Sequence, residues 1–310
     1  MKKTAKAFAP GAISSFFEIY DTENGQPLTD LTKVGAIGGG FGLTKGTYTT
    51  VTATEAKESS LNVTINNQPV LAKTTQQVVE TLLGHTDKKY SITVDHIIEV
   101  PIGMGFGTSA GGALTTGLAL KQALSLPLTY NQVGQVAHVA EIQCLTGLGT
   151  VSSLNFGGGL ILVTKAGAPG ICQIDRIPIS PDYVVVIGYY PSLIPKKSVL
   201  SSPEKKKEIN GYGRIALEAI LADPSLENFL DRCLEFAERA GFTNDRIRAL
   251  VKAAKNAGAV GAAQNMIGEA VHAVVHEENA LSVTEAFKQT LPKGQVLVSR
   301  VDFQGARLIK

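Results

Sequence analysis

The sequence predicts an α+β fold in two domains, residues 1–180 and 181–310. Its 310 residues are enough for two hydrophobic cores. In the first half, segments of β-branched alternation and glycine-rich turns lead into helical stretches. Beyond Pro181, one strongly apolar strand (183–190) is followed mostly by helix and then by a last strand (295–301). Strands on either side of a run of helices are typical of a mostly antiparallel sheet with helices on one face.

The first half alternates extended and helical segments. Its expected strands, which show β-branched or apolar patterns, are 5–9, 34–37, 48–53, 60–65, 91–100, 160–163 and 173–179. Its expected helices are 74–83, 112–124 and 130–146. Pro10 and Gly11 predict a turn after the first strand. The glycine run 38–42 suits either a tight hairpin or a close approach of two backbones.

The second half is expected to contain helices over 203–221, 226–240, 245–256 and 266–277. On the last of these, His272 and His276 are four residues apart, a spacing that can bind zinc on a helix. The HExxH order is absent, and the helix is amphipathic. We therefore interpret this histidine pair as structural or exposed.

Composition excludes several classes of function. Hydrophobic residues make up 44% of the chain, charged residues 18%, and the net charge is +2, so a globular protein without a nucleic-acid partner is expected. The apolar stretches are too short to span a membrane, and Lys6 and Pro10 interrupt any signal sequence. Three widely spaced cysteines fit a reducing compartment. The sequence thus predicts a cytoplasmic protein without a membrane partner.

The segment from Pro101 to Gly111 is expected to carry the chemistry. It follows a strand and opens a helix, and its alternating glycines expose backbone N–H groups to a phosphate. Thr108 and Ser109 would place hydroxyls at the helix N-cap, where the dipole favours an anion, and Ser109 could reach a bound Mg²⁺. The predicted nucleotide-binding residues are Pro101, Gly103, Gly105, Phe106, Gly107, Thr108, Ser109, Ala110 and Gly111.

This loop belongs to neither of two common nucleotide-binding motifs. No GK[ST] follows it, so it is not a Walker A loop, and no GxGxxG joins a strand to a helix. On its own, the loop could equally be an ordinary glycine-rich turn between a strand and a helix.

Two further segments of small residues, 7–14 and 258–268, strengthen the prediction of a nucleotide site. Together with 101–114, they resemble the three motifs of the GHMP kinase superfamily. Within it, the chain is most similar to the archaeal pantoate kinase family, as the matching segments show: 7–17, 105–114, 137–141, 147–149, 157–159 and 166–170. The resemblance implies an N-terminal mixed sheet with helices and a C-terminal ferredoxin-like α/β sandwich. It also implies ATP and Mg²⁺ as cofactors.

Several residues acquire expected roles. Glu141 is the candidate Mg²⁺ ligand beside Ser109, because a hard cation prefers carboxylate oxygen, and its apolar neighbours indicate partial burial. The resemblance places these residues at the substrate: Ser14, His138, Gly158 and Gly261. Lys6 could supply positive charge near the transferred phosphate, or be an exposed strand lysine.

Three positions depart from the pattern of the pantoate kinase family. Ala12 stands where the family has histidine, Thr150 where it has its catalytic aspartate, and Leu162 or a near neighbour where it has a substrate-binding arginine. Thr150 cannot deprotonate the attacking hydroxyl as a carboxylate could, and a bidentate grip on a carboxylate is lost without the arginine. Phosphoryl transfer depends mainly on positioning, so Thr150 remains a candidate catalytic position.

The sequence favours an ATP-dependent kinase of a small branched hydroxy acid, with pantoate as the family-level expectation for coenzyme A biosynthesis. One alternative is a mevalonate 3-phosphate 5-kinase of isoprenoid biosynthesis, which the loss of the aspartate and arginine would fit. Another is a non-catalytic, metabolite-binding regulator. The apolar strand 183–190 would permit a homodimer.

Overall fold

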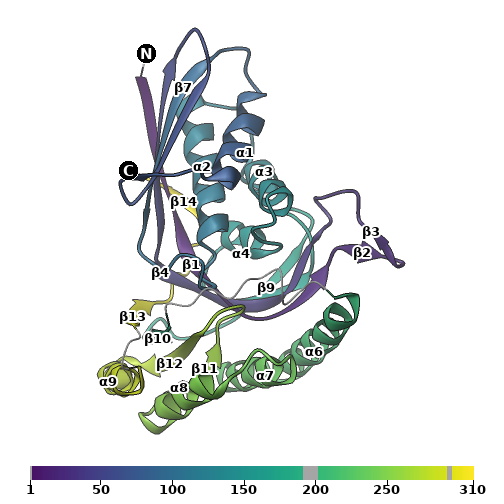
Figure 1. Cartoon of the computed structure of the whole chain (residues 1–310), viewed down its shortest axis with the longest axis vertical. Helices are drawn as coiled ribbons and strands as arrows, with labels where there is room; N and C mark the ends of the chain where they lie inside the picture. The colour runs from purple at the N-terminus through teal and green to yellow at the C-terminus, as the bar shows by residue number, and fades with distance from the viewer. Residues whose placement is uncertain (1, 191–201, 292–294) are drawn as a thin grey trace.

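The computed structural model describes residues 2–190, 202–291 and 295–310. Two sheets organise it: the larger forms the upper part of the molecule in Figure 1, and the smaller lies below it with four helices. The α+β class is thus confirmed.

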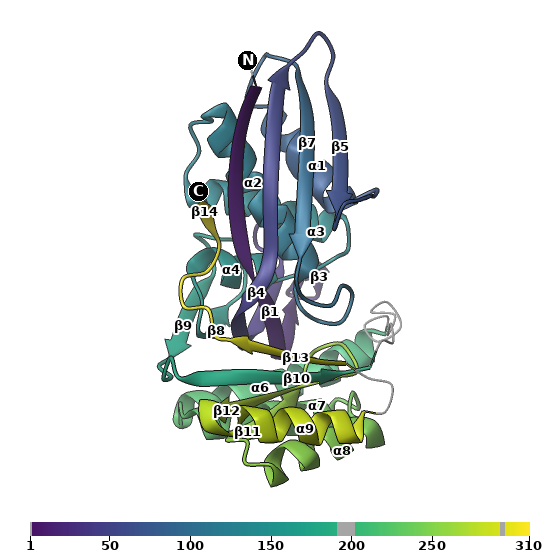
Figure 2. The same cartoon turned by 90° about the vertical axis from the view of Figure 1, so that its left-hand side faces the viewer.

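The larger sheet has eight strands and is almost wholly antiparallel, with β5 and β7 as its parallel pair. Its strands are β1 (Lys2–Tyr20), β4 (Gly35–Glu55), β5 (Ser60–Ile65), β6 (Gln68–Pro69), β7 (Tyr90–Ile98), β8 (Leu160–Lys165), β9 (Gln173–Ile177) and β14 (Arg307–Ile309). Four helices lie on one face of it (Figure 2): α1 (Lys73–Leu83), α2 (Thr108–Leu124), α3 (Tyr130–Gln143) and α4 (Thr150–Phe156). The short hairpin β2 (Thr22–Glu23) and β3 (Gln26–Pro27) extends from the end of β1.

The smaller sheet is antiparallel, in the order β11-β12-β10-β13. Its strands are β10 (Tyr183–Tyr189), β11 (Gly261–Gln264), β12 (Ala270–His276) and β13 (Gln295–Arg300). Its helices are α6 (Pro203–Ala222), α7 (Leu226–Arg239), α8 (Asp245–Asn256) and α9 (Ala280–Thr290), with the short η1 (Glu277–Asn279) before the last. Phe16 and Phe41 from the larger sheet pack on Phe229 of α7, so one core joins the two parts.

The long strands β1 and β4 differ from the prediction. The expected turn at Pro10 and Gly11 is wrong, because β1 continues through both residues with a bulge between them. The glycine run of β4 does not form a hairpin. It forms the other arrangement that the sequence allowed, a close approach of two backbones, here those of β4 and β1. A Cβ on Gly40 would overlap the carbonyl oxygen of Ile13 on β1, so only glycine allows the two strands to pair here.

The expected helix 266–277 is also wrong, because β12 occupies most of it. The small and β-branched apolar residues of β12 fit a strand buried on both faces, and tertiary burial overrides the helical pattern. His272 is buried, with Nδ1 2.8 Å from Oδ1 of Asn265 and Nε2 3.1 Å from Oγ of Ser15. His276 is exposed at the strand end, about 13 Å along the strand from His272. The two histidines therefore form no metal pair.

The apolar strand expected at 183–190 is β10, which lies between β12 and β13. Val184 to Ile187 are buried on both faces of the sheet. Its apolar character thus comes from the core and gives no support to the homodimer, which stays a prediction. In the described part of the chain, no helix combines the length and apolarity needed to cross a membrane.

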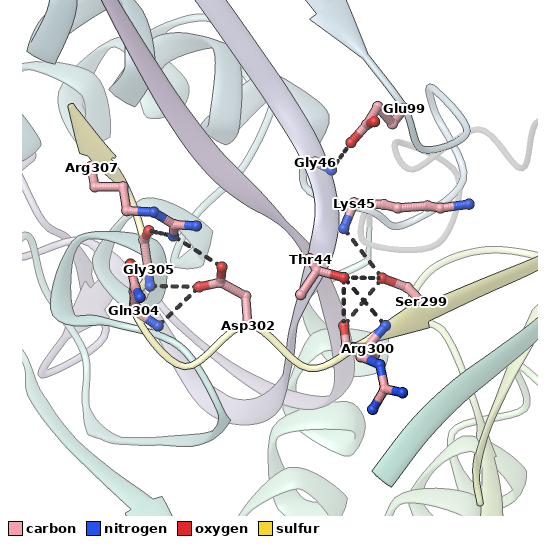
Figure 3. Close-up of polar contacts among 10 residues, drawn as sticks. All are labelled: Thr44, Lys45, Gly46, Glu99, Ser299, Arg300, Asp302, Gln304, Gly305 and Arg307. Carbon is pink, nitrogen blue, oxygen red and sulfur yellow. Dashed lines mark hydrogen bonds and ion pairs between the residues drawn. The ribbon is translucent and has the colours of Figure 1, made fainter. Parts of the chain in front are cut away.

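The end of the chain returns to the larger sheet (Figure 3). Asp302 is buried, and its carboxylate accepts hydrogen bonds from the backbone N–H groups of Gln304 and Gly305 and from Arg307. Its backbone bonds to Gly42 and Gly159. Beyond this point, β14 pairs with β1. The last ten residues, expected to belong to the second domain, therefore complete the sheet of the first.

Acid should destabilise the fold through His96, which is buried between Oγ1 of Thr49 at 2.7 Å and Oγ1 of Thr75 at 3.1 Å. Burial lowers the pKa of His96 to about 4, whereas in the unfolded chain it titrates near 6.5. Between these values only the unfolded state takes up the proton, so stability falls as pH decreases from 6.5 towards 4.

We expect urea unfolding to show a loss of about 2 kcal/mol from His96 between pH 7.5 and pH 5. His272, whose pKa burial lowers to about 3, acts in the same direction. The variant His96→Gln should be less stable at pH 7.5 and less sensitive to acid, while His85→Gln, at an exposed site, should match the parent. An unchanged pH dependence in His96→Gln would contradict this account.

Candidate active site

The predicted phosphate loop joins β7 to α2 and has the conformation that an anion site needs. Gly103, Gly105 and Gly107 have φ of 81°, 79° and 61°, in the left-handed region that glycine tolerates best. The N-cap of α2 is Gly107, and no side chain caps the helix. Thr108 and Ser109, expected at the cap, thus lie in the first turn instead. The backbone N–H groups of this turn remain available to a phosphate.

Packing holds the loop in place from both sides. The carbonyl of Phe106 accepts a 3.0 Å hydrogen bond from the Ala12 N–H of β1, and the Phe106 ring is buried. A Cβ on Gly105 would lie 3.0 Å from the carbonyl oxygen of Met266, and the Met266 N–H donates to the Ser14 carbonyl at 2.7 Å. The three segments singled out in the sequence therefore meet at one place.

Glu141 of α3 faces the first turn of α2. Its Oε1 accepts hydrogen bonds from Oγ of Ser109 and, at 2.6 Å, from Oγ1 of Thr146. The side chain is 3% exposed, as its apolar neighbours predicted. A Cβ on Gly147 would overlap Oε2 of Glu141, so the glycine after Thr146 leaves room for the carboxylate.

These groups suit a magnesium ion. Carboxylate and hydroxyl oxygens are the hard donors that Mg²⁺ prefers, and in kinases Mg²⁺ is held by one or two carboxylates, water and substrate phosphates. Among the described residues no cluster of three or more His, Cys, Asp or Glu side chains could hold a metal alone. Glu141 and Ser109 therefore fit an ion that arrives with the nucleotide.

A cavity of about 770 Å³ opens beside the loop. It lies between the curved parts of β1 and β4, the segment joining α3 to α4, and Met266 and Ile267. Most of its lining side chains are apolar: Ile13, Phe16, Phe17, Leu28, Leu31, Ile37, Ile142, Leu145, Leu148, Ile161 and Val163. The polar side chains of the lining are Ser14, Asp21, Thr146, Thr150 and Ser153. Such a wall suits a small ligand with a hydrocarbon body.

Thr150 and Ala12 lie where the cavity meets the loop. A Cβ on Gly107 would lie 2.7 Å from Cγ2 of Thr150 and 2.9 Å from Cβ of Ala12. Thr150 is the first residue of α4. The one carboxylate in the described lining, Asp21, is ion-paired with Lys206 of α6. The cavity thus presents no unpaired carboxylate that could serve as a general base.

Leu162 lies on the other side of β8 from the cavity. Its side chain belongs to the core shared with the second part, whereas Ile161 and Val163 line the cavity. The residues of this strand that face the cavity are therefore Ile161 and Val163, the aliphatic neighbours of Leu162.

His138 is buried, with Nε2 2.8 Å from the carbonyl oxygen of Val34. Burial lowers the pKa of His138, and the bond to Val34 only partly opposes this. The ring is thus neutral at pH 7, and Nε2–H donates to Val34, a cavity residue. This contact holds the wall of the cavity; His138 itself is absent from the lining.

The other predicted residues fall into two groups. Ser14 lines the cavity, next to the bond with Met266. The structure does not bring Lys6 to the site, because it is exposed on β1, six residues or about 20 Å from Ala12. A Cβ on Gly158 would overlap the Asp302 carbonyl, and one on Gly261 would press on Leu230. Both glycines therefore serve packing outside the cavity.

Sequence reasoning missed two contributors, Thr146 and Asp21. Thr146 was expected inside a helix, but α3 ends at Gln143 and the chain turns back so that Thr146 reaches Glu141. A local signal existed in Gly147, since glycine is common just beyond helix ends. Asp21 gave no signal, because long-range packing brings it here.

A phosphate loop at a helix N-terminus, a carboxylate–hydroxyl pair beside it and an adjoining cavity define a class of protein: a kinase that phosphorylates a small molecule. Residues 70–158 match the model of the GHMP kinases N terminal domain. The chain is 30% identical to the pantoate kinase of Methanocaldococcus jannaschii, over 89% of this chain and 96% of that one. It is 33% identical to the pantoate kinase of Thermococcus kodakarensis, over 89% of each.

A solved structure described as a phosphotransferase related to the CoA biosynthesis pathway is similar over 99% of this chain and 98% of its own, with a TM-score of 0.83 and 28% identity. The chain belongs to the GHMP kinase family. It is accordingly an ATP-dependent small-molecule kinase that uses Mg²⁺.

Replacing Glu141 with Gln should lower kcat/KM about 100-fold, because the amide keeps the hydrogen bonds from Ser109 and Thr146 but not the charge that attracts Mg²⁺. The Mg²⁺ concentration for half-maximal activity should rise. Steady-state kinetics over a Mg²⁺ series measures both. Glu80→Gln, an exposed change on α1, should leave both values unaltered. If Glu141→Gln shows the same Mg²⁺ dependence as the parent, Glu141 is not a ligand of the metal.

Proposed function

We propose that the chain phosphorylates the primary hydroxyl of pantoate, or of a closely similar branched hydroxy acid, for coenzyme A biosynthesis. The observation that carries the proposal is the aliphatic cavity beside the phosphate loop. Its branched side chains suit the branched hydrocarbon body of such an acid. The identity of 30% and 33% to two pantoate kinases over most of the chain supports the same substrate.

The chemistry follows from positioning. Backbone N–H groups of the loop and of the first turn of α2 would bind the nucleotide phosphates. Glu141 and Ser109 would hold Mg²⁺, which would neutralise charge on the transferred phosphoryl group. The cavity would hold the acid with its hydroxyl towards Gly107 and Thr150, and its apolar wall would exclude water from the reaction.

No carboxylate need take the hydroxyl proton early, since phosphoryl transfer proceeds through a loose transition state in which bond formation to the acceptor is slight. Orientation of the hydroxyl is then the main contribution of Ala12, Ser14 and Thr150. The absence of an unpaired carboxylate from the described lining agrees with such a mechanism.

Mevalonate 3-phosphate is a less suitable acceptor. It carries a phosphate besides its carboxylate, and the lining residues in the described part of the chain include no lysine or arginine. Moving two unpaired anionic groups out of water would cost more free energy than hydrogen bonds to the cavity's polar side chains could offset. A regulator without activity is disfavoured because the Ser109–Glu141 pair is intact.

A panel of acceptors tests the proposal. ADP release with Mg-ATP should be at least tenfold faster with pantoate than with mevalonate, mevalonate 3-phosphate or homoserine, and absent without an acceptor. Faster turnover of mevalonate 3-phosphate than of pantoate would indicate a kinase of isoprenoid biosynthesis instead. Binding of ATP with no turnover of any acceptor would identify a regulator.

A further inference from the structure

The acid expected in the cavity needs a cationic partner that the lining does not provide. A carboxylate moved from water into an apolar cavity is stable only if it is paired or hydrogen-bonded. The one charged side chain in the described lining is Asp21, which is acidic itself and is paired with Lys206. Among the described residues, a cationic partner would therefore have to reach in from the rim.

Two arginines are already ion-paired with carboxylates: one contacts the end of β1, and the other lies near the C-terminus. Arg214 is paired with Glu18 at 2.6 Å, and Arg307 with Asp302 at 2.9 Å beneath the Phe8 ring. Arg176 on β9 differs from both. Its side chain has no ion pair within the described chain; its contacts are the Phe156 ring, 5.0 Å from Cζ, and the Phe156 carbonyl, 3.5 Å from Nη2.

The register of the sheet directs Arg176 to the cavity side. It lies opposite Ile161 in the antiparallel pair β8–β9, and residues directly opposite one another project from the same face. Ile161 lines the cavity. A Cβ on Gly157, another lining residue, would overlap Nη2 of Arg176. The guanidinium thus lies against the cavity wall at the C-terminal end of α4.

The two ends of α4 then have complementary properties. At its start, Thr150 adjoins the phosphate loop through Gly107; at its end, Phe156 and Gly157 adjoin Arg176. The helix has seven residues, about 10 Å of length. After hydrogen-bond distances are allowed for at each end, a small hydroxy acid fits between them, with its hydroxyl towards the loop and its carboxylate towards the guanidinium.

We propose that Arg176 binds the carboxylate of the acceptor and so selects acids over neutral alcohols. This inference rests on the proposed function, since it needs an anionic acceptor. The planar guanidinium can give the carboxylate two parallel N–H···O bonds. Its present bond to the Phe156 carbonyl is long and uses one N–H, so four others remain for a ligand.

The test compares an acid with its uncharged counterpart. In Arg176→Met, which keeps the aliphatic stem over Phe156, KM for pantoate should rise tenfold to about 100-fold, while kcat and KM for ATP stay within about twofold. The parent enzyme should prefer pantoate to its primary amide, and the variant should lose that preference. Arg176→Lys should recover part of the affinity, because it keeps the charge without the fork.

A capping role of Arg176 at α4 would give a different pattern. Activity towards the acid and the amide would then fall together, with a lower thermal midpoint, and the inference would be wrong. Equal KM for pantoate in the variant and the parent would also overturn it. Arg248→Met controls for net charge, since Arg248 is exposed on α8 beside Asp245, and should behave as the parent.

The same measurements distinguish failure of the proposed function from failure of the role given to Arg176. If the parent enzyme phosphorylates no hydroxy acid, both proposals fall together. If it phosphorylates pantoate but shows no preference for the acid over the amide, the function stands and the role of Arg176 is rejected.

Discussion

The site depends on one strand, β1, which makes backbone hydrogen bonds to both loops that surround the reaction. The Ala12 N–H donates to Phe106 of the phosphate loop, and two residues later the Ser14 carbonyl accepts from Met266. Both bonds use the backbone, so they set the separation of the two loops whatever side chains the loops carry. The close pairing of β1 with the glycines of β4 in turn fixes where β1 lies. In the proposed mode of binding, substrate and nucleotide would meet across this single strand.

Much of this arrangement could be predicted from local pattern. The phosphate loop and Ser109 follow from glycine spacing before a helix, and a partly buried Glu141 follows from its apolar neighbours; the structure brings these groups together. Pairing between distant segments could not be predicted. The segment 266–277 has a helical pattern, yet it becomes β12 because β10 and β11 provide strand partners on both sides. Lys6 was a candidate because of its positive charge on the first strand, but it lies six residues before Ala12 on β1 and does not reach the site.

The phosphate loop and the cavity differ in how they can bind an anion. The phosphate loop and the first turn of α2 offer backbone dipoles without a formal charge of their own, which suits a nucleotide that brings its own cation. The cavity is almost uncharged, so an acid bound there meets little competing attraction. A single guanidinium at the rim can then decide orientation, because a bound carboxylate has one favourable partner instead of several.

The return of the last residues to β1 has a consequence for synthesis of the chain. Strand β14 pairs with Lys6, Ala7 and Phe8, at the opposite end of the sequence. While the ribosome is still adding the second half, this edge of the larger sheet has unpaired N–H and C=O groups, which other chains could join. Residues 2–180 by themselves therefore leave this part of the sheet edge unpaired. A nascent chain stalled before Arg307 would therefore present an open edge at Lys6, Ala7 and Phe8, on the part of β1 that leads away from Ala12 and the phosphate loop.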